Sequence, residues 1–308
     1  MNKLIKDYIT SFLDNPNAEI HKVGDGEANW VYRVNDTLFR IPKNDQGKLE
    51  LKHEVAVSKI ALQYMQSVPG IAIPEFEFIH PEGNFAVCKF VPGINYDENE
   101  IRAWPADSKR KAAAKLAEIM NALSKIDPAM INASIQKAAL DPADFSNDKT
   151  IQARYERFKH KASRYYPDID TRFRQYETDY PNGMIDESVI VVHGDLHDGN
   201  ILFNTDHEVV GVIDFADMIV ANGTYELRNM SGFGMDFVVM VAAKLDHSFG
   251  NFDPEKFLNM CILYEMLMTL RYLLKEIPLD KRYREATSYL EHEGIKHLRH
   301  PFYVSEVG

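Results

Sequence analysis

The spacing of apolar residues changes twice along the first 91 positions. Leu4, Ile5 and Tyr8 recur at the helical period, whereas later segments alternate apolar and polar residues as half-buried strands do. Asn35-Asp36 separates two alternating segments and predicts a hairpin turn. The pattern predicts helices over 4–13 and 47–66 and strands over 28–34, 38–42, 71–79 and 84–91. This order is typical of a small lobe that combines a mixed β-sheet with one main helix.

Beyond residue 91 the helical period dominates, apart from one central segment. Asp253-Pro254-Glu255 is a strong helix start, since it combines an N-cap, a proline at the first position and an acid in the first turn. Asp107 is the expected N-cap of an earlier helix. Helices are expected over 107–123, 148–177, 237–245, 253–277 and 280–293. The chain is therefore expected to be an α+β protein with a lobe at 1–91 and a mainly helical lobe at 92–308.

Three short apolar segments surround a polar cluster in the centre of the chain. Val189 to Val192 leads into His193-Gly194-Asp195-Leu196-His197-Asp198-Gly199-Asn200, and a tight hairpin of two apolar segments then ends at Asp214. A carboxylate, an amide five positions later and a second carboxylate after the hairpin suit a magnesium ion and a hydroxyl nucleophile, because Mg2+ takes hard oxygen ligands. The arrangement matches phosphoryl transfer, in which an Asp and an Asn of one loop act with a metal-binding Asp further along the chain.

These motifs resemble a known family. The segment HGDLHDGNIL, followed by GVIDFAD, is similar to the catalytic core of the aminoglycoside phosphotransferase family, which also includes macrolide and other small-molecule kinases. The resemblance covers about residues 20 to 275 and implies a bilobal, protein-kinase-like fold. It also implies that Asp195 orients and deprotonates the acceptor hydroxyl, that Asn200 and Asp214 hold Mg2+, and that His193 braces the loop.

The resemblance also implies a nucleotide site in the first lobe. Its expected residues are Gly24 and Gly26 over the phosphates, Arg40 as the phosphate-binding cation, Glu54 as the acid that pairs with it, and Lys89, Phe90 and Val91 as the hinge that meets the purine.

Two positions depart from the family pattern. Arg40 stands where the family usually has lysine, and arginine keeps the charge but is not a neutral substitute. Lys43 is the alternative phosphate ligand. Glu226 stands where the family usually has a buried Asp that supports the catalytic loop, and the Asp-Pro before that position is missing.

Composition narrows the range of partners and compartments. The net charge of −11 argues against nucleic acid, although it suits either a cationic small molecule or simple solubility. No apolar run approaches the roughly 20 residues that span a membrane, and the N-terminus lacks a signal-peptide pattern. Cys88 and Cys261 lie inside apolar segments, as reduced thiols of a cytoplasmic protein do. We expect a cytoplasmic monomer or weak dimer.

The predicted reaction transfers the γ-phosphoryl group of ATP or GTP, with Mg2+, to a hydroxyl of a small molecule. An aminoglycoside-type acceptor is favoured, and a macrolide or a choline- or sugar-type metabolite is the alternative. Acids of the helical lobe that could meet an amine are Glu156, Asp179, Glu265 and Glu276. Two other classes stay open: a non-catalytic kinase-fold binding protein, and a metal-dependent hydrolase that uses the cluster His193, Asp195, His197 and Asp198.

Overall fold

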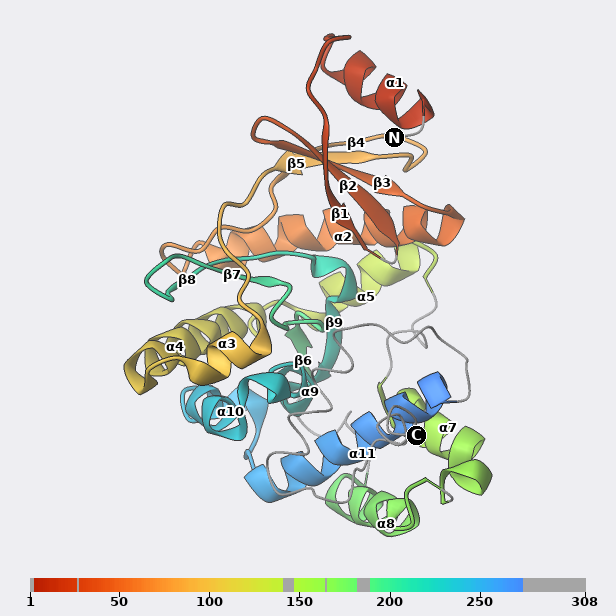
Figure 1. The fold of residues 1–308 in the computed structure, drawn as a ribbon, viewed down its shortest axis with the longest axis vertical. Helices are drawn as coiled ribbons and strands as arrows, with labels where there is room; N and C mark the ends of the chain where they lie inside the picture. Colours follow the sequence, from red (N-terminus) through yellow and green to blue (C-terminus); the bar gives the residue numbers. More distant parts are fainter. Residues whose placement is uncertain (1–2, 27, 141–146, 164, 182–188, 274–308) are drawn as a thin grey trace, which may run out of the picture. The chain divides into compact units, whose positions relative to one another are not determined.

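The computed structural model describes residues 3–26, 28–140, 147–163, 165–181 and 189–273 (Figure 1). The chain divides into two compact units, each built from three stretches of sequence. The first comprises 1–96, 115–145 and 190–220, and the second comprises 97–114, 146–189 and 221–308. The catalytic loop predicted from the sequence therefore belongs to the same unit as the N-terminal sheet, whereas the predicted division at residue 91 stays a prediction.

The first unit is built around a five-stranded sheet of order β1-β2-β3-β5-β4. Its strands are β1 (His21–Asp25), β2 (Asn29–Val34), β3 (Thr37–Pro42), β4 (Phe76–Ile79) and β5 (Ala86–Lys89). Every pairing in it is antiparallel, so the expectation of a mixed sheet is corrected. Tight turns join β1 to β2 and β2 to β3, and such short connections link antiparallel strands.

The strand β1 was missing from the predicted element order. Its sequence, His-Lys-Val-Gly-Asp, shows no apolar alternation, and all of its residues except Gly24 are exposed. An edge strand with no buried face leaves no period-two pattern in the sequence. Gly24, which is expected to lie over the phosphates with Gly26, is therefore inside a strand and opposite Val31.

The two faces of the sheet are covered by different helices, α1 (Lys3–Phe12) and α2 (Asp45–Met65) (Figure 1). The cluster on the α1 face contains Ile5, Ile9, Tyr32, Val34, Phe39, Ile41, Phe85 and Val87. The cluster on the α2 face contains Leu51, Val55, Phe76, Ala86 and Cys88. Because successive side chains of a strand alternate between faces, Arg40 points to the face opposite Phe39 and Ile41, where α2 lies.

The predicted central hairpin is present in the first unit. It consists of β7 (Ile201–Phe203) and β8 (Val209–Val212), while β6 (Val189–Val192) pairs with β9 (Ile219–Asn222). Two single bridges, Ala72 to Gly211 and Ile94 to Phe203, attach the hairpin to segments more than 100 residues earlier in the chain. The helix α5 (Pro128–Lys137) also belongs to this unit.

The second unit is helical, as expected. Its helices are α3 (Glu98–Ala103), the start of α4 (Ala106–Leu123), α7 (Asn147–Ala162), α8 (Ile169–Asp179), α9 (Gly223–Arg228), α10 (Met235–Ala242) and α11 (Pro254–Leu273). The helix α11 packs against α7, α8 and α9. None of the helices within the described ranges is long and apolar enough to cross a membrane.

Three helix predictions need adjustment. The segment 148–177 forms two helices, because Pro167 disfavours the helical conformation in the residue before it. Asp107 lies in the first turn of α4 and is not its N-cap, since the helix already begins at Ala106. The predicted helix at 280–293 and the end of the preceding one near 277 lie outside the described residues.

Candidate active site

The polar loop begins where β6 ends, and Gly194 near its start has a backbone conformation that requires glycine. Gly194 has a φ of +88°, a conformation that L side chains rarely adopt. A Cβ there would lie 2.0 Å from the carbonyl oxygen of Asp217, which is too close for any other residue. The loop can therefore pass this backbone only with glycine at position 194.

His193 lies fully buried beneath the loop and joins it to the end of β8. Its Nδ1 accepts a hydrogen bond from the Asp195 amide at 3.3 Å, and its Nε2 donates to the Ile213 carbonyl oxygen at 3.1 Å. These partners assign the tautomer with the proton on Nε2. Burial lowers the pKa of His193 to about 4, so the ring is neutral near pH 7. Both ring nitrogens are used within the protein, which fits a brace and not a metal ligand.

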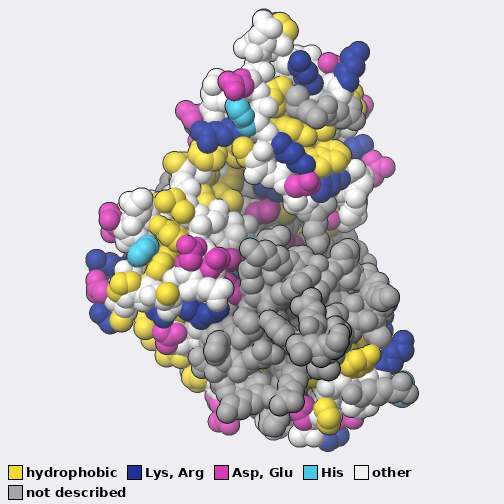
Figure 2. Space-filling view, viewed as in Figure 1, with side chains coloured by type: hydrophobic (Ala, Val, Ile, Leu, Met, Phe, Trp, Pro, Cys, Tyr) yellow, Lys and Arg dark blue, Asp and Glu magenta, His cyan; other side chains and the backbone are white. Residues whose placement is uncertain are grey.

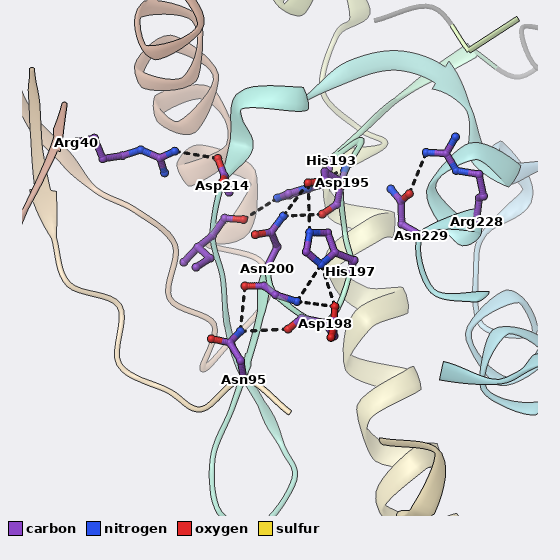
Figure 3. Close-up of polar contacts among 12 residues, drawn as sticks. Arg40, Asn95, His193, Asp195, His197, Asp198, Asn200, Asp214, Arg228 and Asn229 are labelled. Atoms are coloured by element: carbon purple, nitrogen blue, oxygen red, sulfur yellow. Dashed lines mark hydrogen bonds and ion pairs between the residues drawn. The ribbon is translucent and has the colours of Figure 1, made fainter. Parts of the chain in front are cut away.

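Asn200 faces Asp195 across the loop (Figure 3). The Asn200 Nδ2 donates to the backbone oxygen of Asp195 at 2.8 Å and to its carboxylate Oδ2 at 3.1 Å. The Ile213 amide donates to the backbone oxygen of Asn200 at 3.0 Å, which brings Asn200 beside the residue before Asp214. Because the amide nitrogen is turned towards Asp195, the Asn200 side-chain oxygen is the atom that can meet a cation.

Asp214 ends the hairpin in an unusual backbone conformation. Its φ and ψ are 66° and 68°, in the left-handed region that few residues other than glycine adopt. Backbone conformations of this kind cluster at functional sites in proteins, which agrees with the role predicted for Asp214. The Asp214 carboxylate Oδ1 lies 3.0 Å from Nη2 of Arg40.

Arg40 bridges two acids that come from different elements. Its Nη1 lies 2.7 Å from Oε1 of Glu54 on α2, which is completely buried. Burial raises the pKa of Glu54, and the Arg40 guanidinium opposes this rise. Burial alone would lower the pKa of Arg40, but the charges of Glu54 and Asp214 outweigh it and raise that pKa. Arg40 is therefore a permanent cation between the sheet and the hairpin.

The Arg40 cluster retains unused hydrogen-bonding groups. Within the described part of the chain, Arg40 Nε and Glu54 Oε2 are buried without a hydrogen-bond partner. A buried donor without a partner costs free energy, and a ligand can relieve that cost.

His197 contacts the predicted base directly, although the phosphotransfer interpretation of the sequence gave it no role and only the hydrolase alternative used it. Its Nε2 lies 3.4 Å from Asp195 Oδ2, and its Nδ1 donates to Asp198 Oδ1 at 3.0 Å. The same Asp198 oxygen accepts from the Gly199 amide at 2.9 Å. Burial would lower the pKa of His197, but the two carboxylates raise it to about 10. The sequence signal was its position two residues after Asp195, which alone does not show where the ring points.

Asn95 is a second residue that the sequence did not indicate. Its Nδ2 contacts the backbone oxygens of Asp198 at 3.1 Å and Gly199 at 3.0 Å (Figure 3). It also lies 3.0 Å from the backbone oxygen of Ile201. The amide carries two hydrogens, so the three contacts are shared. No local pattern marks Asn95, because its partners lie more than 100 positions later.

The predicted phosphate turn lies at the exposed end of the sheet. Between Gly24 and Gly26, Asp25 forms ion pairs at 2.6 Å with both Lys22 and Lys43. These pairs, with the hydrogen bond from Lys22 first, lower the pKa of Asp25 to about 2. Figure 2 shows basic and acidic side chains interspersed on the surface of the first unit, to which this turn belongs. Lys43, the alternative phosphate ligand, therefore pairs with the turn, whereas Arg40 pairs with Glu54 and Asp214.

The predicted hinge begins at Lys89, the last residue of β5, and continues beyond the strand. Lys89 is exposed and pairs with Glu75 at 2.7 Å, and the Arg33 guanidinium lies 3.6 Å from the ring centroid of Phe90. The Phe90 amide donates to the Asp36 carbonyl oxygen at 2.8 Å, so this amide is already used. Val91 is buried. The purine-binding role of these three residues stays a prediction.

The remaining predicted residues lie in the second unit. Glu226 is buried in the first turn of α9, and its support of the loop stays a prediction. Glu156 pairs with Lys159 at 2.6 Å, Asp179 accepts from Gln175, and burial raises the pKa of Glu265 to about 7. Glu276 lies outside the described residues.

The fold resembles that of solved small-molecule kinases. The structure matches the GDP and kanamycin complex of APH(2")-IIIa with a TM-score of 0.74 and 22% identity, over 96% of this chain and 99% of that one. It matches the streptomycin–ATP complex of APH(2")-IIa with a TM-score of 0.65 and 17% identity, over 95% and 96%. It also matches macrolide 2'-phosphotransferase type I with a TM-score of 0.60 and 15% identity, over 94% and 98%. These likenesses show that the chain has the same fold as the matched enzymes.

Sequence comparison assigns the family. The model of the phosphotransferase enzyme family APH matches residues 19–258, and the chain belongs to this family. No curated protein matches the chain. The matched range contains the sheet, the catalytic loop and the hairpin that ends at Asp214.

Proposed function

We propose that this protein transfers the γ-phosphoryl group of ATP or GTP to a hydroxyl of a small molecule, with an aminoglycoside-type acceptor favoured. The observation that carries the proposal is the double contact of Asn200 with the backbone and carboxylate of Asp195, beside the strand end that presents Asp214. A base and two oxygen ligands are thereby grouped on one loop and the hairpin that follows it. A non-catalytic binding protein would not require this arrangement.

Asp195 is the base in this proposal. Its side chain is 41% exposed, so an acceptor hydroxyl can reach it, while Asn200 and the His193-bound backbone fix its position. Asp195 orients the hydroxyl towards the phosphorus and accepts its proton as the new bond forms. Positioning supplies most of such an acceleration, since the reaction needs little covalent help from the protein.

The donor set around the loop fits a magnesium ion. The Asn200 side-chain oxygen and the Asp214 carboxylate are hard oxygen ligands, which Mg2+ prefers over nitrogen or sulfur. When bound, Mg2+ neutralises charge on the phosphates. Asn200 and Asp214 would hold it.

Arg40 provides a cation for the phosphates. The buried Arg40 Nε, which has no hydrogen-bond partner in the described structure, gives the guanidinium a donor to spare. Glu54 would keep the guanidinium oriented after Asp214 turns to the metal, as the 2.7 Å contact allows. Gly24, Gly26 and the hinge at Lys89–Val91 would complete the nucleotide site in a lobe formed by residues 1–91.

The choice of acceptor rests on charge and on the fold relatives. The net charge of −11 favours a cationic molecule, and a fold relative was solved with kanamycin. The macrolide relative keeps a second acceptor class open, and both classes carry amines.

The test is a coupled nucleotide-turnover assay with Mg2+ and either ATP or GTP against aminoglycosides, macrolides and amino alcohols, with product confirmed by mass spectrometry. Wild-type protein should phosphorylate at least one acceptor. Asp195→Ala should lose on the order of 10³-fold or more in turnover while staying folded. Asp206→Ala, an exposed aspartate on the turn of the same hairpin, is the matched control and should keep full activity. Phosphotransfer by Asp195→Ala at the wild-type rate would refute the proposed base.

A further inference from the structure

One oxygen of the proposed base is contacted by two side chains of its own loop. Asn200 Nδ2 lies 3.1 Å from Asp195 Oδ2, and His197 Nε2 lies 3.4 Å from the same atom (Figure 3). A carboxylate rotates easily about its last bond, since that torsion has broad minima. Two contacts from different directions restrict the rotation more than Asn200 can alone.

The imidazole of His197 is itself held in place. Its Nδ1 donates to Asp198 Oδ1 at 3.0 Å, and the Gly199 amide holds that same oxygen at 2.9 Å. A Cβ on Gly199 would lie 2.6 Å from Cε1 of His197, so the ring packs directly on the glycine backbone. Its side chain is 24% exposed. This packing directs Nε2 towards Asp195.

The support extends beyond the loop. The backbone oxygens of Asp198 and Gly199, the two residues that hold the ring, accept from the Asn95 side chain. A series of contacts therefore runs from Asn95 through residues 198 and 199 to His197 and then to Asp195.

We propose that His197 is a positioning residue that fixes the rotation of the Asp195 carboxylate, so that Oδ2 is held by the loop and Oδ1 is presented to the acceptor hydroxyl. This inference rests on the proposed phosphotransfer. It gives a role to the His197 side chain, which binds neither the metal nor the nucleotide in the proposed function.

Two amide substitutions separate this role from general support of the loop. The glutamine amide nitrogen can reach the position of Nε2, whereas the shorter asparagine reaches only the position of Nδ1. His197→Gln should keep kcat within about threefold of wild type. His197→Asn and His197→Ala should lower kcat by about 10- to 100-fold with both KM values unchanged, because a small misplacement of a reacting group is enough to cause such a loss. All three variants are compared by thermal unfolding.

An equal loss of kcat in His197→Gln and His197→Asn would overturn the inference and leave the proposed function intact. A rise in acceptor KM at constant kcat would also overturn it.

A second measurement does not depend on turnover. The side-chain 15N–1H signals of His197 are identified by their disappearance in His197→Gln and are then compared between wild type and Asp195→Asn. They should shift, while those of His207 on the hairpin turn should not. If wild type transfers phosphate to no acceptor, the proposed function fails, and unchanged His197 signals in Asp195→Asn would overturn this inference separately.

Discussion

The loop from His193 to Asp214 and the turn from Gly24 to Gly26 both carry predicted site residues, but the protein holds them differently. The loop rests on buried side chains and on partners far away in sequence, such as Arg40 and Asn95. The turn is held by ion pairs of Asp25, which is half exposed, with two nearby lysines. Buried pairs are screened little by salt, whereas exposed ones are screened strongly. The comparison predicts that substitutions around the loop lower stability and turnover much more than substitutions in the turn.

The largest effect on stability is expected at Arg40. Arg40→Ala leaves the buried carboxylate of Glu54 without its cation, which should lower the free energy of unfolding by about 3 kcal/mol or more. Arg40→Lys restores the charge but cannot bridge Glu54 and Asp214 with a rigid fork, so recovery should be partial. Urea denaturation measures both, with Lys43→Ala as the control on the same strand end. A loss below about 1 kcal/mol in Arg40→Ala would contradict the importance given to this bridge.

The next effect is a dependence of stability on pH from His193. Its pKa is lowered to about 4 in the folded protein, from 6.5 when exposed, so the unfolded chain binds more protons between these values. The lowered pKa therefore contributes fully to the free energy of unfolding above pH 6.5. This contribution is lost as the pH falls towards 4, and the loss is roughly 3 kcal/mol at most. His197, whose pKa is raised, keeps its own contribution below pH 6.5 and does not add to this loss.

Denaturation of wild type and His193→Gln between pH 4 and 7 measures the His193 contribution. The variant should show a shallower decline than wild type. Parallel curves would mean that His193 is not buried in the neutral form.

Asn95→Ala should have a smaller effect. It removes shared contacts to three backbone oxygens, which corresponds to about 1 kcal/mol of stability. Turnover should fall by about tenfold, because the loop that carries Asp195 loses support. Asn84→Ala is the control, since the Asn84 side chain donates to Glu82, two residues away, and not to the loop. Equal turnover in the two variants would contradict a role for Asn95 in the loop.

The smallest effect is expected in the turn. Asp25→Asn removes ion pairs that water and salt already weaken, so the melting temperature should change by no more than about 1 °C. Differential scanning fluorimetry at low and high salt measures this. A shift of several degrees would remove the distinction between the turn and the loop.

Much of the fold could be predicted because apolar spacing reports burial directly. The hairpin that ends at Asp214 alternates apolar segments with a polar turn, and the residues 193–200 form a continuous motif. The edge strand β1 could not be found in this way, since its exposed residues carry no pattern. The antiparallel pairing of the sheet also depends on contacts between distant strands, which a single sequence does not reveal.

In the candidate site too, some residues could be predicted from a local motif, whereas others depend on tertiary structure. Asp195, Asn200 and Asp214 lie within one local motif, so their grouping could be predicted. The contact of His197 with Asp195 depends on the direction of a ring, and that of Asn95 with the loop depends on tertiary structure. Arg40 contacts Glu54 because its side chain lies on the face of the sheet that α2 covers and Glu54 lies on the side of α2 that faces the sheet. The spacing of residues in the sequence does not determine this orientation.

The two bridges that attach the hairpin, at Ala72 and Ile94, also bear on how the protein is made. Both partners leave the ribosome before the hairpin does, because the chain is synthesised from its N-terminus. The sheet and the segment that carries Asn95 can thus be in place when residues 193–214 emerge. The two bridge partners of the hairpin, Ala72 and Ile94, are therefore already synthesised when the hairpin emerges. Nascent chains that end before residue 189 would lack this region altogether and would be inactive however well their N-terminal sheet had formed.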